Sequence, residues 1–190
     1  MFIIKNKYFL IIESIKDINL SNIKKFNKFI IIYRSKKIKD NLNRLIRFRK
    51  ECKRKKIKFY IANNIKLCIF LNSDGIYLSS YNKSFKPLNI IKSNFDIVGS
   101  AHNFSEIFEK LKQRCKLIIF SKLFLVNYDK KASYLGVIKF NKLLFSFNKK
   151  IIPLGGINSD NLNNLKLINS EGFSLLSEIK KKPAIISRLF

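Results

Sequence analysis

Eight short apolar runs, spread along the whole chain, constrain the fold more than any other feature of the sequence. They are rich in Ile, Phe, Tyr and Val, and most are continuous rather than interrupted by polar residues at every second position. Continuous apolar strands are typical of a parallel sheet that is buried on both faces. The runs cover residues 8–12, 29–33, 57–61, 75–78, 95–99, 117–120, 151–154 and 172–176.

Segments with helical spacing lie between these runs. Residues 104, 107, 108 and 111 are apolar at i, i+3, i+4 and i+7, and Asn103 with Glu106 is a helix-start signal. Strands alternating with helices predict repeated β-α units, and eight such units predict an α/β fold of the small (β/α)8 barrel type. An open doubly wound sheet is the alternative, but no G-x-G-x-x-G motif follows an early strand.

No internal repeat, low-complexity block or linker divides the sequence, so we expect one domain over residues 1–190. The three cysteines have no spacing that suggests a zinc site or a disulfide framework. No apolar run approaches the roughly 18 residues of a membrane span, and the first residues lack a signal-peptide pattern. We therefore expect a cytoplasmic protein that does not enter a membrane.

The charge of the chain is strongly basic, with 39 Lys and Arg against 12 Asp and Glu and a formal net charge of +27. A basic protein attracts phosphates, nucleic acids or anionic lipids. The chain is also crowded with Lys, Ile, Asn and Phe, whose codons are rich in A and T, and its lysines are scattered. We attribute most of the charge to codon bias. We expect small-molecule phosphate and pyrophosphate ligands as partners rather than nucleic acid, and the sequence leaves a homo-oligomer open.

Gly155 and Gly156 are two of only six glycines, and they follow the apolar run at 151–154. Asn158 then gives a helix-start signal, so bare backbone N–H groups at a helix start could hold an anion. In a (β/α)8 barrel the loops after the seventh and eighth strands form the usual phosphate site, which adds Leu176 and Ser177. The alternative is a tight turn that needs glycine for packing.

Other polar residues follow the strands on the same expected face. Arg34 and Lys36 lie one residue apart, so in extended chain both could reach one pyrophosphate, although a basic strand end facing solvent would look the same. Ser100 and His102 lie two apart after the fifth run, and both could face the barrel mouth. No third residue completes a nucleophilic triad.

Several motifs follow one another from about residue 8 to residue 179, and each alone is weak. They are Tyr33-Arg34-Ser35-Lys36, Asp74-Gly75-Ile76-Tyr77-Leu78, Val98-Gly99-Ser100-Ala101-His102, Leu154-Gly155-Gly156-Ile157 and Gly172-x4-Ser177-x-Ile179. In this order they resemble the thiamine phosphate synthase family, which includes the TenI-type thiazole tautomerases. The resemblance implies a barrel that joins a pyrimidine pyrophosphate to a thiazole phosphate and releases pyrophosphate.

The resemblance also implies roles for single residues. Arg34, Lys36, Asn63 and Ser100 match the pyrophosphate contacts, with Arg34, Lys36 and Ser100 as the catalytic set. Backbone at Gly155, Gly156, Leu176 and Ser177 would hold the thiazole phosphate. We add His102, and also Lys130, which lies beside the position of the family's loop lysine, as substrate-binding candidates.

The chain departs from the family pattern at the metal site. The two aspartates that would hold Mg²⁺ fall at Asn63 and Asn82, so two negative charges are missing. Magnesium is usually held by one or two carboxylates together with substrate phosphates, so we expect much weaker Mg²⁺ binding at these amides. The tautomerase histidine falls at Lys122, so that activity is not expected.

Three functions remain open on the sequence. The first is a divergent thiamine-phosphate synthase of thiamine biosynthesis, in which Arg34, Lys36 and neighbouring lysines stabilise the leaving pyrophosphate. The second is a barrel that binds phosphate ligands without catalysis. The third is a basic protein that binds nucleic acid.

Overall fold

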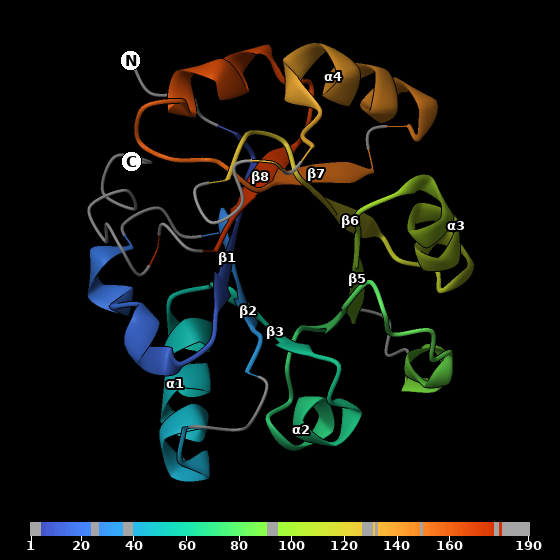
Figure 1. The fold of residues 1–190 in the computed structure, drawn as a ribbon. Helices are drawn as coiled ribbons and strands as arrows, with labels where there is room; N and C mark the ends of the chain where they lie inside the picture. Colours follow the sequence, from blue (N-terminus) through green and yellow to red (C-terminus); the bar gives the residue numbers. More distant parts are fainter. Residues whose placement is uncertain are drawn as a thin grey trace.

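The computed structural model describes residues 5–23, 27–35, 40–90, 95–126, 131, 133–148, 150–176 and 179. Within them, eight strands pair in parallel in the order β7-β6-β5-β4-β3-β2-β1-β8 and form a nearly closed barrel, with helices outside the ring of strands (Figure 1). The predicted (β/α)8 barrel is confirmed. The strands are β1 (Lys7–Ile12), β2 (Phe29–Tyr33), β3 (Lys58–Ala62), β4 (Gly75–Leu78), β5 (Asp96–Ala101), β6 (Leu117–Ser121), β7 (Ile151–Leu154) and β8 (Gly172–Leu175).

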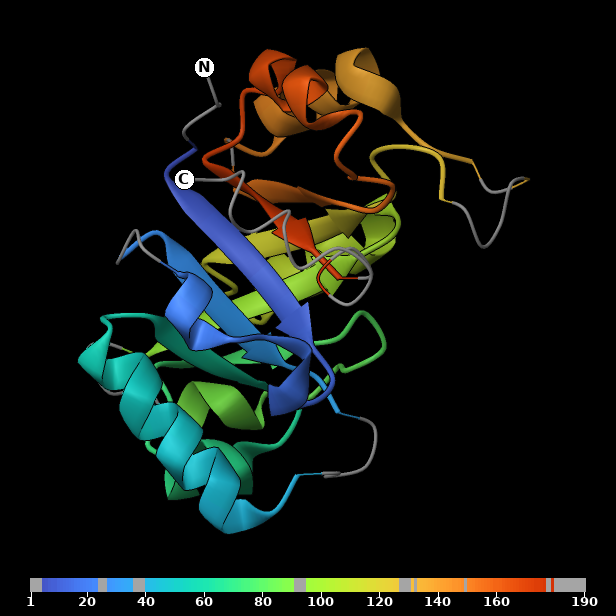
Figure 2. The ribbon, with the colours of Figure 1, turned by 90° about the vertical axis from the view of Figure 1, so that its left-hand side faces the viewer.

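Among the described residues, α-helices occur in only some of the connections between strands. These are α1 (Leu42–Arg54), α2 (Ile65–Phe70), α3 (Phe104–Lys112) and α4 (Gly136–Ser146), and α1 and α4 lie on opposite sides of the barrel (Figures 1 and 2). Short 3-10 helices occupy other connections: η1 (Ile15–Asp17), η2 (Leu20–Asn22), η3 (Lys86–Ile90) and η4 (Leu162–Leu167). These abbreviated elements let the barrel fit into a short chain. No helix of the described residues is long and apolar enough to span a bilayer.

One expectation about helices was wrong. Asn158 does not start an α-helix, because its side-chain oxygen accepts the N–H groups of Asp160 and Asn161 in a turn, and only the 3-10 helix η4 follows. In α3 the cap at Asn103 is confirmed, but Phe104 and Phe108 are 60% and 55% exposed. Their rings pack against Phe147 at the surface instead of the barrel.

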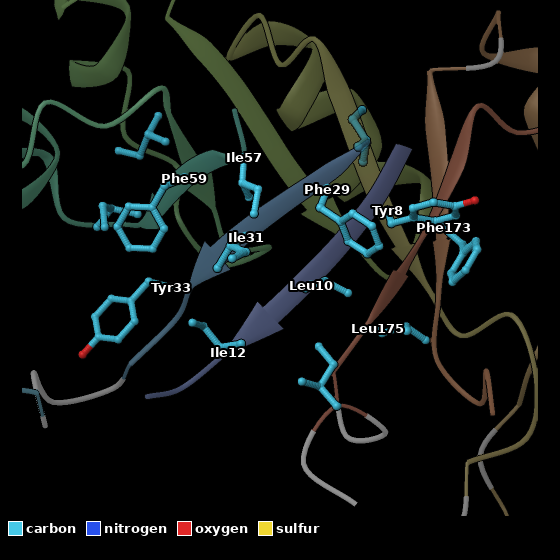
Figure 3. Packing of buried hydrophobic residues seen from close by; sticks show 14 of the residues in the cluster. Tyr8, Leu10, Ile12, Phe29, Ile31, Tyr33, Ile57, Phe59, Phe173 and Leu175 are labelled. Atoms are coloured by element: carbon cyan, nitrogen blue, oxygen red, sulfur yellow. The ribbon is translucent and has the colours of Figure 1, made fainter. Parts of the chain in front are cut away.

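The strand side chains alternate between two apolar clusters, as the pleat of a strand requires. An inner cluster contains Phe9, Ile11, Ile30 and Ile32, with no helix residue among its buried members, and it fills the barrel. An outer cluster packs the other strand faces against the helices. Figure 3 shows part of this outer cluster around Tyr8. The centroid of the Tyr8 ring lies 5.1 Å from that of Phe29 and 5.2 Å from that of Phe173.

Carboxylates brace the end of the barrel where the strands begin. Asp96 accepts hydrogen bonds from the Tyr60 hydroxyl at 2.6 Å and from the ammonium groups of Lys58 and Lys116. Burial alone would raise the pKa of Asp96, but these three donors hold it below its usual value. The amino-terminal end of a barrel contributes to stability rather than chemistry, so this cluster ties β3, β5 and β6 together.

Candidate functional site

A cavity of about 480 Å³ opens where β2, β3 and β4 end. The described residues that line it are mostly polar, with three cations and no Asp or Glu among them. This is the carboxyl end of the strands, where barrels of this kind carry their active sites. The polar residues that the argument uses are Arg34, Asn63, Lys66, Tyr81, Asn82 and Lys86.

Arg34 reaches the cavity because it continues the inward face of β2. Its backbone N–H donates to Ile12 O at 2.8 Å, which prolongs the β1–β2 ladder by one step. Below it, burial raises the pKa of the Tyr77 hydroxyl, while a hydrogen bond with Ser100 and the charge of Arg34 act in the opposite direction. Tyr77 is therefore influenced by both Arg34 and the buried Ser100, and Ser100 is not among the described residues that line the cavity.

Asn63 has the left-handed backbone conformation, with φ of 57°, which turns its side chain across the mouth. Its Oδ1 accepts hydrogen bonds from Ser79 N and from Asn82 Nδ2, both at 3.0 Å. Its Nδ2 donates to Ser79 Oγ at 2.7 Å and to the Tyr81 hydroxyl at 3.1 Å. The amide of Asn63 is thus fully used in hydrogen bonds within the protein.

The two predicted metal positions meet, but as a pair of amides. Asn82 Oδ1 accepts the backbone N–H of Ser84 at 2.9 Å, so its oxygen faces its own loop while its nitrogen faces Asn63. Among the described residues, no three His, Cys, Asp or Glu side chains come together as metal ligands. Magnesium requires oxygen ligands, and these amides present saturated or inward-facing oxygens. The residues present do not fit a magnesium site.

A buried lysine, which sequence reasoning missed, supports the Asn82 loop from behind. Lys110 is 0% exposed, and its Nζ donates to Asn82 O at 2.6 Å and to Gln113 Oε1 at 2.9 Å. Gln113 Nε2 also donates to Asn82 O and to Ser84 O. Burial lowers the pKa of Lys110. The available signal was its position three residues after the buried Ile107, on the inner stripe of α3.

The lysine side chain needs the space that Gly99 leaves. A Cβ on Gly99 would lie 2.7 Å from Lys110 Cδ and 2.9 Å from Cys115 Sγ. That glycine belongs to the motif on β5, so its role here is to admit the Lys110 chain beneath the strand.

His102 lies apart from the cavity at the start of α3. Its ring Nδ1 lies 3.1 Å from Glu106 Oε2, and its backbone N–H donates to the same oxygen at 2.7 Å. The side chain is 54% exposed, and His102 is not among the described residues that line the cavity. In the structure, His102 contributes to the helix start.

Gly155 and Gly156 form a tight turn on another part of the mouth. Both have positive φ, 95° and 71°, and a Cβ on Gly156 would lie 2.4 Å from Phe124 O. Neither backbone N–H donates a hydrogen bond to another described residue. Leu176 packs against the inner apolar cluster. Lys36, Lys130 and Ser177 lie outside the described residues.

The comparisons with known proteins agree with this architecture. A family model described as thiamine monophosphate synthase matches residues 16–179. A thiamine-phosphate synthase from Prochlorococcus marinus is 26% identical over 94% of this chain and 50% of its own length. One from Clostridioides difficile is 22% identical over 74% of the chain and 67% of its own length. The chain thus spans about half the length of the first of these relatives.

Solved structures show the same fold at low identity. A thiamine phosphate pyrophosphorylase from Pyrococcus furiosus matches with a TM-score of 0.74 at 16% identity, covering 97% of this chain and 93% of its own. A structure described as KGPDC from Streptococcus mutans matches with a TM-score of 0.68 at 11% identity, over 96% and 94% of the two chains. Because the family model covers most of the sequence, the chain belongs to the thiamine monophosphate synthase family.

Proposed function

We propose that the chain is a thiamine-phosphate synthase, which joins hydroxymethylpyrimidine pyrophosphate to a thiazole phosphate and releases pyrophosphate. Family membership supports the reaction. One observation carries the assignment of the site: the described lining of the cavity includes Arg34, Lys66 and Lys86 and no carboxylate. A cavity lined by one sign of charge concentrates ligands of the opposite sign, so pyrophosphate suits it.

The chemistry follows from these charges. The C–O bond between the pyrimidine methylene and the pyrophosphate breaks, and both electrons leave with the pyrophosphate. Fixed cations stabilise the negative charge that grows on the leaving oxygens. Arg34 offers a planar guanidinium that can bind two oxygens, while Lys66 and Lys86 each supply a point charge. The thiazole nitrogen then forms the new C–N bond to the methylene carbon, and no proton has to move.

The thiazole phosphate would bind at the Gly155–Gly156 turn. Among the described residues no acceptor competes for the two backbone N–H groups, which supports their donation to phosphate oxygens. The positive φ values turn these N–H groups in a way that other residues rarely allow.

Replacing Arg34 tests this assignment. In an assay that supplies both substrates and measures thiamine phosphate, Arg34→Ala should lower kcat/KM by about 100-fold or more, because a donor to the leaving group is lost. Arg44→Ala is the matched control, since Arg44 is an exposed residue of α1 that does not line the cavity. Equal activity of the two variants would contradict the role of Arg34.

A second candidate is a barrel that binds the same ligands without turnover, and the amides at Asn63 and Asn82 favour it. It predicts that thiazole phosphate raises the melting temperature while no thiamine phosphate forms from the two substrates. Product formation that depends on Arg34 would exclude this candidate.

A further inference from the structure

We propose that the pyrophosphate site of this chain works without a divalent metal ion, because the hydrogen-bonded amide pair of Asn63 and Asn82, with the cations around it, stands where a metal would be held. This inference rests on the proposed function, since it concerns the same cavity. It reverses the cofactor requirement that the family resemblance implies.

The orientation of both amides is fixed by backbone donors. Ser79 N and Ser84 N can only donate, so each requires an oxygen opposite it. Ser79 therefore fixes Oδ1 of Asn63, and Ser84 fixes Oδ1 of Asn82. The group that Asn82 turns toward Asn63 is then its NH₂, at 3.0 Å from Oδ1. A cation between them would face an N–H group where it needs an oxygen.

The lone pairs of Asn63 are also occupied. Its Oδ1 accepts from both Ser79 N and Asn82 Nδ2, which uses the two lone pairs of an amide oxygen. Binding a metal there would break at least one of these hydrogen bonds. It would gain a neutral ligand, which holds Mg²⁺ more weakly than a carboxylate does.

The surrounding charge disfavours a cation as well. Lys110 places a buried Nζ 2.6 Å from the carbonyl oxygen of Asn82, and burial affects its pKa more than the charges of Glu106 and Glu109 do. Arg34, Lys66 and Lys86 line the cavity in front of that loop. These positive charges repel a divalent cation and attract pyrophosphate.

The total charge of the site is the same whether it holds two carboxylates with Mg²⁺ or two amides without a metal. Two carboxylates and one Mg²⁺ ion sum to zero charge, and two amides without a metal also sum to zero. The loss of both aspartates together therefore leaves the total charge at the pyrophosphate unchanged only when the metal is lost with them.

Pyrophosphate binding tests the inference directly. Isothermal titration of the whole chain with pyrophosphate in EDTA should give clear binding. Added Mg²⁺ should leave the affinity unchanged or weaken it, because Mg²⁺ also complexes free pyrophosphate. Binding that occurs only with Mg²⁺, or no binding in either buffer, would overturn the inference.

The double variant Asn63→Asp/Asn82→Asp should restore a metal requirement. Both side chains keep an oxygen for Ser79 N and Ser84 N, and Asp tolerates the left-handed backbone at position 63. In EDTA we expect its pyrophosphate affinity to fall by at least about tenfold and its melting temperature to drop, with both recovered by Mg²⁺. The control Asn43→Asp/Asn164→Asp adds the same charge at exposed positions and should show neither effect.

Activity separates the two proposals. Thiamine phosphate formed in EDTA supports both, whereas product formed only with Mg²⁺ supports the synthase and overturns the metal-free site. Pyrophosphate binding in EDTA without product in either buffer supports the metal-free site and removes the synthase. An acidic double variant that binds pyrophosphate in EDTA as well as the unchanged chain does would also overturn the inference.

Discussion

Gly156 is required for the packing of its turn and is also a candidate donor to phosphate. Its φ of 71°, and the distance of only 2.4 Å that would separate a Cβ from Phe124 O, require glycine for packing alone. Its N–H donates no hydrogen bond to another described residue, which is what a phosphate site needs. The sequence could indicate that glycine is required there, but a packed turn and a phosphate turn use the same residue.

A Gly156→Ala variant should therefore lose more stability than Gly136→Ala. Both residues have positive φ, which costs about 1–2 kcal/mol for alanine, but a Cβ on Gly136 meets nothing within 4 Å. The free energy of unfolding in urea measures the difference. Equal losses would show that the contact with Phe124 can relax.

The pairing of Asn63 with Asn82 could not be predicted from residue types. The two residues are 19 positions apart, and each alone reads as an ordinary loop asparagine. Their contact depends on the adjacent ends of β3 and β4 and on the left-handed backbone at Asn63. The resemblance identified the two positions, and the structure added how their side chains face each other.

At the scale of elements, apolar periodicity predicted that α3 exists but not which face it buries. Of the four apolar residues in the pattern, only Ile107 is fully buried, and the helix buries Lys110 beside it. Lysine is almost never fully buried without a partner, so a pattern of apolar residues cannot find it. The space beside Gly99 accommodates the Lys110 side chain on the inward face.

Replacing the buried lysine tests its part in the site. Lys110→Met keeps much of the packing and removes a buried charge, but it leaves the buried Oε1 of Gln113 without the donor that Lys110 supplies, so stability should fall by about 1–3 kcal/mol. Pyrophosphate affinity should weaken by about 3- to 10-fold, because a nearby positive charge is lost. Lys112→Met, on the exposed face of α3, is the control. Titration that finds equal affinities for the two variants would contradict the electrostatic role of Lys110.

The brace at the start of the strands makes a pH prediction. The pKa of Asp96 is lower in the folded protein than in the unfolded chain, despite burial, because Lys58, Tyr60 and Lys116 donate to it. The carboxylate of Asp96 therefore stabilises the fold fully when the pH is above its unfolded pKa of about 3.9. This stabilisation is lost as the pH falls through the lower pKa of the folded protein. Asp96→Asn should cost about 1–3 kcal/mol at neutral pH.

The difference in the free energy of unfolding between the unchanged chain and Asp96→Asn should therefore become smaller as the pH falls below about 4. Urea unfolding at several pH values measures it, with Asp160→Asn as an exposed control. A gap that stays constant down to strongly acid pH would mean that the carboxylate charge of Asp96 does not brace the barrel.

At the scale of the whole molecule, the barrel was predictable because its strands are buried on both faces and therefore appear as continuous apolar runs. The predicted runs agree with the observed strands to within two residues at either end. Where the strands begin, Asp74 and Asp96 are paired with cations, whereas the described lining of the cavity where β2, β3 and β4 end holds cations and no carboxylate. That difference between the two ends arises from the fold, so composition alone shows only a net charge.

One assay tests the central claim most directly: the whole chain is incubated with hydroxymethylpyrimidine pyrophosphate and thiazole phosphate, in EDTA and in Mg²⁺, and both products are quantified. We predict thiamine phosphate and pyrophosphate in equal amounts, already in EDTA. The absence of thiamine phosphate in both buffers would contradict the account.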